Sequence, residues 1–124
     1  MERKSLKSEF TEATEERQIR FSANIVLEMS EKGKSDRKIK EYLIKTGASE
    51  AVIREAFELA AYEGLVPERE RAKGEAERLL SSEGGVSIKS ARRIISRLVY
   101  SGFNDEILEE IAEQLQEKLD EKNF

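Results

Sequence analysis

Two segments of the chain align without a gap, and together they decide the fold: SDRKIKEYLIKTGASEAVIREAF at residues 35–57 and SARRIISRLVYSGFNDEILEEIA at residues 90–112. Each has apolar residues at helical spacing, then a glycine, then a residue suited to cap a second helix. The glycines fall on one another, as do the two caps, Ser49 and Asn104. The pattern predicts two helices in each segment, related by an internal repeat.

An accidental match is the alternative, because helical period and terminal glycines make many amphipathic helix pairs align. The glycine followed two positions later by a cap in both segments favours a true repeat. Upstream, SEKG at residues 30–33 resembles SEGG at residues 82–85, which extends the repeat to three helices.

Six helices and no strand are expected along the chain, since no segment shows alternating apolar residues or β-branched enrichment. The fold class is therefore all-α, with tandem three-helix repeats stacked in an elongated or curved array. The polar residues 1–10 are expected to form a flexible tail, residues 11–66 the first repeat and residues 67–124 the second. The expected helices span 11–32, 36–47, 50–64, 68–82, 88–101 and 105 onward.

Composition excludes several classes of function. The 124 residues include no cysteine and no histidine, which removes thiol chemistry and the commonest general base and metal ligand. No apolar stretch approaches the roughly 20 residues of a membrane span, and the N-terminus lacks a signal core. We therefore expect a cytoplasmic protein without membrane contact.

Positive charge is concentrated in the expected helix 88–101, although the chain carries a formal net charge of -4. Three cations recur at i, i+4 and i+8, opposite the apolar side of the helix. Tyr100 joins that face, and one arginine lies at its margin. Such a stripe suits phosphate or an acidic protein surface. Its cations are Lys89, Arg93 and Arg97, with Arg92 at the margin.

Two other interpretations of this stripe remain open. It is either the solvated face of a core helix, or it neutralises the carboxylates of the following helix, among them Asp105, Glu109 and Glu113. Helix 36–47 carries a weaker basic group, for which a solubilising role is the alternative to partner binding. Its candidate residues are Arg37, Lys38 and Lys40.

Catalytic and metal sites are not predicted. Glu110 and Glu113 have the i, i+3 spacing of carboxylate sites in helical bundles, but those sites include histidine. The glycines of SSEGGVS, residues 81–87, lack the lysine of a phosphate-binding loop and read as a linker. We expect no catalytic residue, cofactor or metal.

The segments IKEYLIKTGASEAVIREAFELAAYEGL, residues 39–65, and ARRIISRLVYSGFNDEILEEIAEQL, residues 91–115, resemble the RecX family. RecX proteins are built from tandem three-helix repeats and regulate the RecA recombinase by lodging in the groove of its DNA filament. The resemblance implies a non-enzymatic regulator in recombination, DNA repair and the SOS response, whose partner is a recombinase filament with bound DNA. It also allows weak nucleic-acid contact.

The chain departs from the family pattern in two respects. LVPERERA at residues 65–72 replaces the acidic turn and Phe-Ala pair typical of the family, and there is room for two repeats where three are common. The alternative function is a helical protein-interaction module unrelated to recombination. It would be a monomer or weak homo-oligomer, self-associating through the apolar stripe of the last helix at Leu115 and Leu119.

Overall fold

The structure is a computed structural model that describes the backbone of residues 6–122 and the side chains of residues 14–122. Within residues 6–122 the chain forms six α-helices and no strand, which confirms the all-α prediction. No helix in that range is long and apolar enough to cross a membrane. The helices are α1 (Leu6–Glu31), α2 (Asp36–Lys45), α3 (Glu50–Tyr62), α4 (Glu68–Ser82), α5 (Ile88–Tyr100) and α6 (Asp105–Lys122).

Most helix boundaries follow the expected caps. The Ser35 and Ser49 side chains accept hydrogen bonds from the Lys38 and Val52 amides, each at 3.2 Å. Helix α1 begins at Leu6, five residues before its expected start, and residues 1–5 of the expected tail lie outside the described residues. Helix α5 begins at Ile88 as expected, where Ser87 is its cap and forms a capping box with Ser90.

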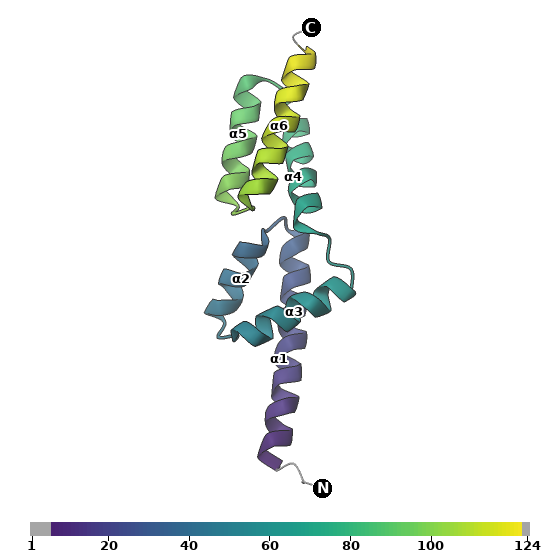
Figure 1. Cartoon of the computed structure of the whole chain (residues 1–124), viewed down its shortest axis with the longest axis vertical. Helices are drawn as coiled ribbons and strands as arrows, with labels where there is room; N and C mark the ends of the chain where they lie inside the picture. The colour runs from purple at the N-terminus through teal and green to yellow at the C-terminus, as the bar shows by residue number, and fades with distance from the viewer. Residues whose placement is uncertain (1–5, 123–124) are drawn as a thin grey trace.

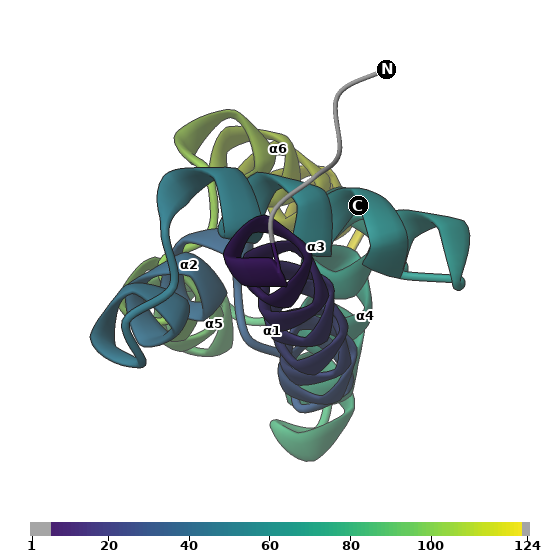
Figure 2. The ribbon, with the colours of Figure 1, turned by 90° about the horizontal axis from the view of Figure 1, so that it is seen from below.

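The molecule is elongated, and its helices form two halves along the long axis (Figure 1). Helices α1, α2 and α3 pack on one another in the first half, and α4, α5 and α6 do so in the second. The halves differ in arrangement. Helix α3 crosses α1 steeply, as the view from below also shows (Figure 2), whereas α4, α5 and α6 lie side by side along the long axis.

Each half has its own apolar core. One cluster of buried residues is drawn from the segment 26–60 and the other from the segment 72–115. Helices α2 and α5 bury equivalent side chains in these cores, Ile39 and Leu43 in one and Ile94 and Leu98 in the other. Because the halves pack differently and α5 is capped three residues earlier than the alignment requires, the tandem repeat stays a prediction from the sequence.

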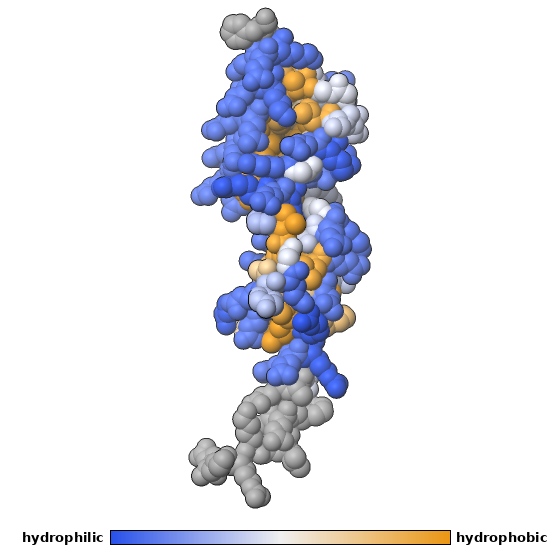
Figure 3. Space-filling model, turned by 90° about the vertical axis from the view of Figure 1, so that its right-hand side faces the viewer, coloured by the Kyte–Doolittle hydropathy of each residue, from blue (hydrophilic) through white to orange (hydrophobic). Residues whose placement is uncertain are grey.

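A polar joint connects the two halves. Ser35 Oγ donates to the Ser101 carbonyl at 2.7 Å, and the Asp36 amide donates to Glu68 Oε1 at 3.3 Å. The Arg71 guanidinium reaches back from α4 to Asp36 Oδ1 at 2.5 Å and to the Lys34 carbonyl at 3.2 Å. Apolar side chains are exposed only in narrow areas over each half on the face shown in Figure 3, which is otherwise hydrophilic.

Candidate partner-binding surface

Helix α5 presents its cations to solvent because its opposite side is anchored in the core. Ile94 and Leu98 are fully buried, one turn apart, and fix the rotation of the helix. Lys89, Arg93 and Arg97 are exposed as a result. Tyr100 lies at the end of the same face with 84% of its surface accessible, so the predicted stripe faces solvent.

The stripe continues from the second half onto the first. Helix α2 is stacked below α5 along the long axis of the molecule (Figures 1 and 2). The Lys38 ammonium of α2 lies over the Tyr100 ring, 5.6 Å from its centroid, a cation–π contact. We call the surface formed by Lys38, Lys89, Arg93, Arg97 and Tyr100 the basic stripe.

Three of the predicted basic residues lie elsewhere. Arg92 lines a groove between α5 and α6. Arg37 and Lys40 line a different groove at the joint, together with acidic residues, and Arg37 is 3.8 Å from Glu41 within α2. The structure therefore divides the predicted set between three surfaces. The carboxylates of the joint groove are Asp36, Glu68 and Asp105.

The acidic residues of α6 do not neutralise the basic stripe through ion pairs within residues 14–122. Glu110 instead pairs with two cations of α4, Arg69 at 3.1 Å and Lys73 at 2.9 Å. The hydrogen bond from Lys73 lowers the pKa of the Glu110 carboxyl, and Arg69 adds to the effect. Helix α6 thus directs this carboxylate toward the first turns of α4 and not toward the stripe residues of α5.

The border of the basic stripe is formed by α4. Arg93 Nη1 lies 3.2 Å from Glu83 Oε2 at the end of that helix. The Glu75 carboxyl has a lowered pKa, chiefly through its hydrogen bond from Arg78, with Arg97 as a smaller favourable charge. Since Arg93 is half exposed, its pair with Glu83 is worth only about 0–1 kcal/mol and competes weakly with a polyanionic partner.

Sequence reasoning missed the buried Arg71. Its side chain is only 5% exposed, and Nη1 also donates to the Val66 carbonyl at 2.7 Å, whereas Nε is buried without a partner among the described residues. The neighbouring Glu68 carboxyl has a raised pKa, first because it is partly buried and then because Asp36 is close. No local sequence pattern indicates that Arg71 is buried, because its partners Lys34 and Asp36 lie about 35 residues away in the chain.

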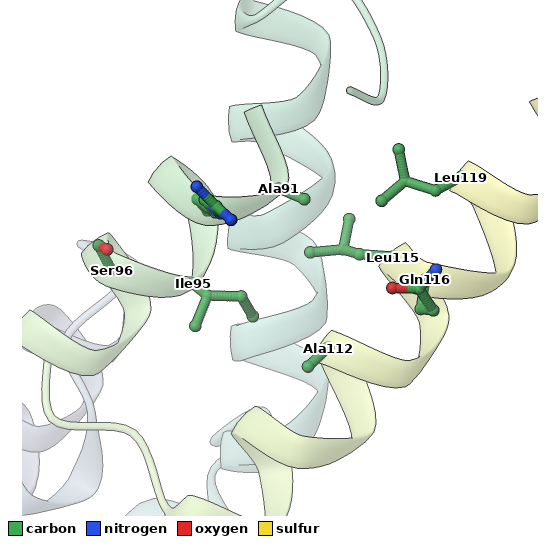
Figure 4. A pocket seen from close by; sticks show the side chains of 8 residues that line it. Ala91, Ile95, Ser96, Ala112, Leu115, Gln116 and Leu119 are labelled. Atoms are coloured by element: carbon green, nitrogen blue, oxygen red, sulfur yellow. The ribbon is translucent and has the colours of Figure 1, made fainter. Parts of the chain in front are cut away.

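The apolar side of α5 includes residues that the core does not bury. Ala91 and Ile95 are only half-buried, and Val99 is 54% exposed, although all three share the side of the helix opposite the cations. Ala91 and Ile95 point across a groove toward Leu119, Leu115 and Ala112 of α6 (Figure 4). The groove has a volume of about 420 Å³ and opens to solvent.

No group of three or more metal-ligating side chains comes together within the described part of the chain. Comparison of the chain with models of protein families, with curated proteins and with solved structures finds no match. A function is therefore inferred from the residues of this chain and from their arrangement.

Proposed function

We propose that the protein is a non-enzymatic regulator that binds a recombinase–DNA filament through the basic stripe, as the resemblance to RecX implies. The observation that supports this most directly is the contact between Lys38 and Tyr100, which joins cations from both halves into one surface. A surface extended along the long axis fits a long, repetitive polyanion better than a compact ligand.

The chemistry of the stripe supports a polyanionic partner. Arginine offers planar, bidentate donors to phosphate or carboxylate, and lysine a point charge. Tyr100 adds an exposed ring between the two basic helices. Because the whole chain is acidic, binding would depend on this local surface, and indiscriminate attraction to nucleic acid would be weak.

The test is a recombinase strand-exchange and ATP-hydrolysis assay with the wild-type chain and with the double variant Arg93→Glu/Arg97→Glu. The proposal expects the wild type to slow both reactions and the variant to lose most of the effect. Arg17→Glu/Arg54→Glu is the matched control, because it reverses two exposed arginines on α1 and α3 and should behave as the wild type. Circular dichroism checks that each variant is folded.

Two results would contradict the proposal: no inhibition by folded wild type at micromolar concentration, or equal inhibition by both double variants. Titration of salt adds a second criterion, because contacts to phosphate release counterions and weaken steeply with salt. Binding to free single-stranded DNA that equals binding to the filament would assign the surface to DNA alone.

A protein-interaction module is the second candidate function. The open apolar groove between α5 and α6 favours it, because exposed apolar surface of this kind is typical of protein contacts.

A further inference from the structure

The groove between α5 and α6 is apolar along its floor and charged along both rims. The floor is formed by Ala91 and Ile95 on one helix and by Ala112, Leu115 and Leu119 on the other (Figure 4). Ile88 and Val99, 64% and 54% exposed, extend the apolar face of α5 beyond both ends of this floor. The described structure therefore leaves an apolar strip that is only partly covered, since Leu115 is buried whereas Ile88 and Val99 are exposed.

The rims of the groove carry opposite charges. Arg92 borders it on α5, and Lys89 is the next cation around that helix. On α6 the face directly beyond the groove carries three exposed carboxylates, and groove-lining Gln116 donates to one of them, Asp120, at 2.9 Å. The carboxylates of this rim are Glu109, Glu113 and Asp120.

We infer that a second copy of this chain covers the groove, in a two-fold dimer whose axis runs parallel to the groove. A two-fold axis in that direction places the basic rim of each copy against the acidic rim of the other and apolar floor against apolar floor. An axis across the groove would instead oppose like charges, which costs binding energy. Charge complementarity thus selects the parallel arrangement of the two α5–α6 pairs.

The register of the dimer follows from the same geometry. The C-terminal end of α6 lies beside the start of α5, where Lys122 Nζ donates to the Val86 carbonyl at 2.8 Å. Ala91 accordingly faces Leu119 across the groove (Figure 4). Arg92 therefore lies level with Asp120, and in the parallel dimer the arginine of each copy meets the aspartate of the other.

The dimer leaves the basic stripe free except at Lys89, which lies next to the basic rim of the groove. Arg93 and Arg97 lie farther around α5 from the groove than Arg92, and the residue of the stripe contributed by α2, Lys38, belongs to the other half. Self-association is therefore independent of the proposed filament contact, and each can fail without the other. A dimer would present two basic stripes to one filament and gain avidity.

Sedimentation equilibrium of the full chain, from low micromolar to near-millimolar concentration, tests the inference. The wild type should show a monomer–dimer equilibrium, and Ala112→Arg, which places a cation on the apolar floor, should be monomeric throughout. Ala51→Arg is the matched control, because this alanine is an exposed residue of α3, and it should dimerise as the wild type. A monomeric wild type would overturn the dimer.

Charge reversal tests the parallel arrangement. Arg92→Glu and Asp120→Lys should each raise the dimer dissociation constant by about tenfold, because each places like charges opposite one another twice per dimer. The double variant Arg92→Glu/Asp120→Lys should return it to within about threefold of the wild type. Stronger association of either single variant would overturn the parallel axis. Unchanged dimerisation in Arg93→Glu/Arg97→Glu would separate this contact from the basic stripe.

Discussion

The two halves of the molecule have different residues, and different packing, at the contact between their second and third helices. When residue 35 is aligned with residue 90, Lys40 and Phe57 correspond to Ile95 and Ala112. In the first half the Phe57 ring packs against the core and the Lys40 ammonium lies over it, 5.3 Å from the centroid. In the second half the smaller alanine leaves the apolar groove, and isoleucine lines it.

The comparison shows how one helix pattern gives a closed surface in one place and an open one in another. Helices α2 and α5 bury the same two positions, so their rotation on the core is alike. The halves differ at the neighbouring position, which is Lys40 in α2 and Ile95 in α5. A lysine can cover an aromatic ring and keep its ammonium group hydrated. An isoleucine beside an alanine has no such polar end, and Ile95 stays partly exposed in the groove.

The largest expected effect is on the two separate cores. Leu43→Ala and Leu98→Ala each remove a fully buried side chain from one cluster, and each should lower the free energy of unfolding by about 2–5 kcal/mol. Hydrogen exchange should show increased opening in the half that carries the substitution, with a smaller change in the other. Equal loss of protection in both halves would show that the joint couples them into one cooperative unit.

The helices could be predicted from the sequence, but not how much of each apolar face a neighbouring helix covers. The bounds of α4, residues 68–82, were expected as they are found, because glycines and Pro67 mark its neighbourhood. The exposure of Val99 was not predictable, since periodicity gives an apolar face but not how much of it a neighbour covers.

The candidate surface was predictable to a similar extent. Lys89, Arg93 and Arg97 share a face because of their spacing alone. The contact of Lys38 with Tyr100 and the burial of Arg71 depend on how one half is placed on the other. Such long-range placement leaves no local trace in a single sequence.

The second prediction concerns Phe57 and its counterpart Ala112, whose residue types are exchanged between the two halves. Phe57→Ala should lower the free energy of unfolding by about 2 kcal/mol, less than a full core deletion because the ring is only partly buried. Ala112→Phe, the reciprocal change, should raise the unfolding temperature slightly by covering Ile95 and Leu115. Thermal unfolding at low protein concentration, where a dimer contributes little, measures both.

If Phe57→Ala stabilised the protein and Ala112→Phe destabilised it, the interpretation of the groove as an unfilled position would be contradicted. A further check is the double variant Ile95→Lys/Ala112→Phe, which copies the first half into the second. It should keep the fold and abolish dimerisation in sedimentation.

The third prediction compares the equivalent glycines that end α2 and α5. Both have positive φ, +92° at Gly47 and +85° at Gly102, so alanine at either costs about 1 kcal/mol in backbone strain. A methyl group on Gly47 meets nothing within 4 Å, whereas one on Gly102 lies 3.0 Å from Ser35 Oγ and 3.2 Å from the Arg37 guanidinium. Gly102→Ala should therefore cost more.

Chemical denaturation of the two alanine variants measures the difference, which we expect to be about 1 kcal/mol. The additional loss at Gly102 should be accompanied by weaker protection of the joint, because Ser35 must move away from the Ser101 carbonyl. Equal destabilisation by the two substitutions would show that the joint yields to the methyl group without cost.

The smallest expected effect concerns the joint itself, at Glu68. Partial burial and the nearby Asp36 raise the pKa of this carboxyl, although the Asp36 amide, Arg71 and Lys40 act in the opposite direction. The folded state therefore holds the proton more tightly than the unfolded chain, whose glutamate pKa is about 4.3. This contribution to stability is present below that pH and is lost as pH rises through the raised value.

Glu68→Gln removes the charge and keeps an oxygen that accepts from the Asp36 amide. The variant should thus be slightly more stable than the wild type at pH 7 and equal to it near pH 3, as measured by urea denaturation at both values. Glu63→Gln, at the exposed end of α3, is the control for an ordinary surface carboxyl in the first half, where the charge pairs with Arg20 at 2.5 Å. Loss of the Glu63 charge should lower the free energy of unfolding at pH 7, whereas loss of the Glu68 charge should raise it. A change in the same direction for both variants would rule out burial as the dominant influence on Glu68.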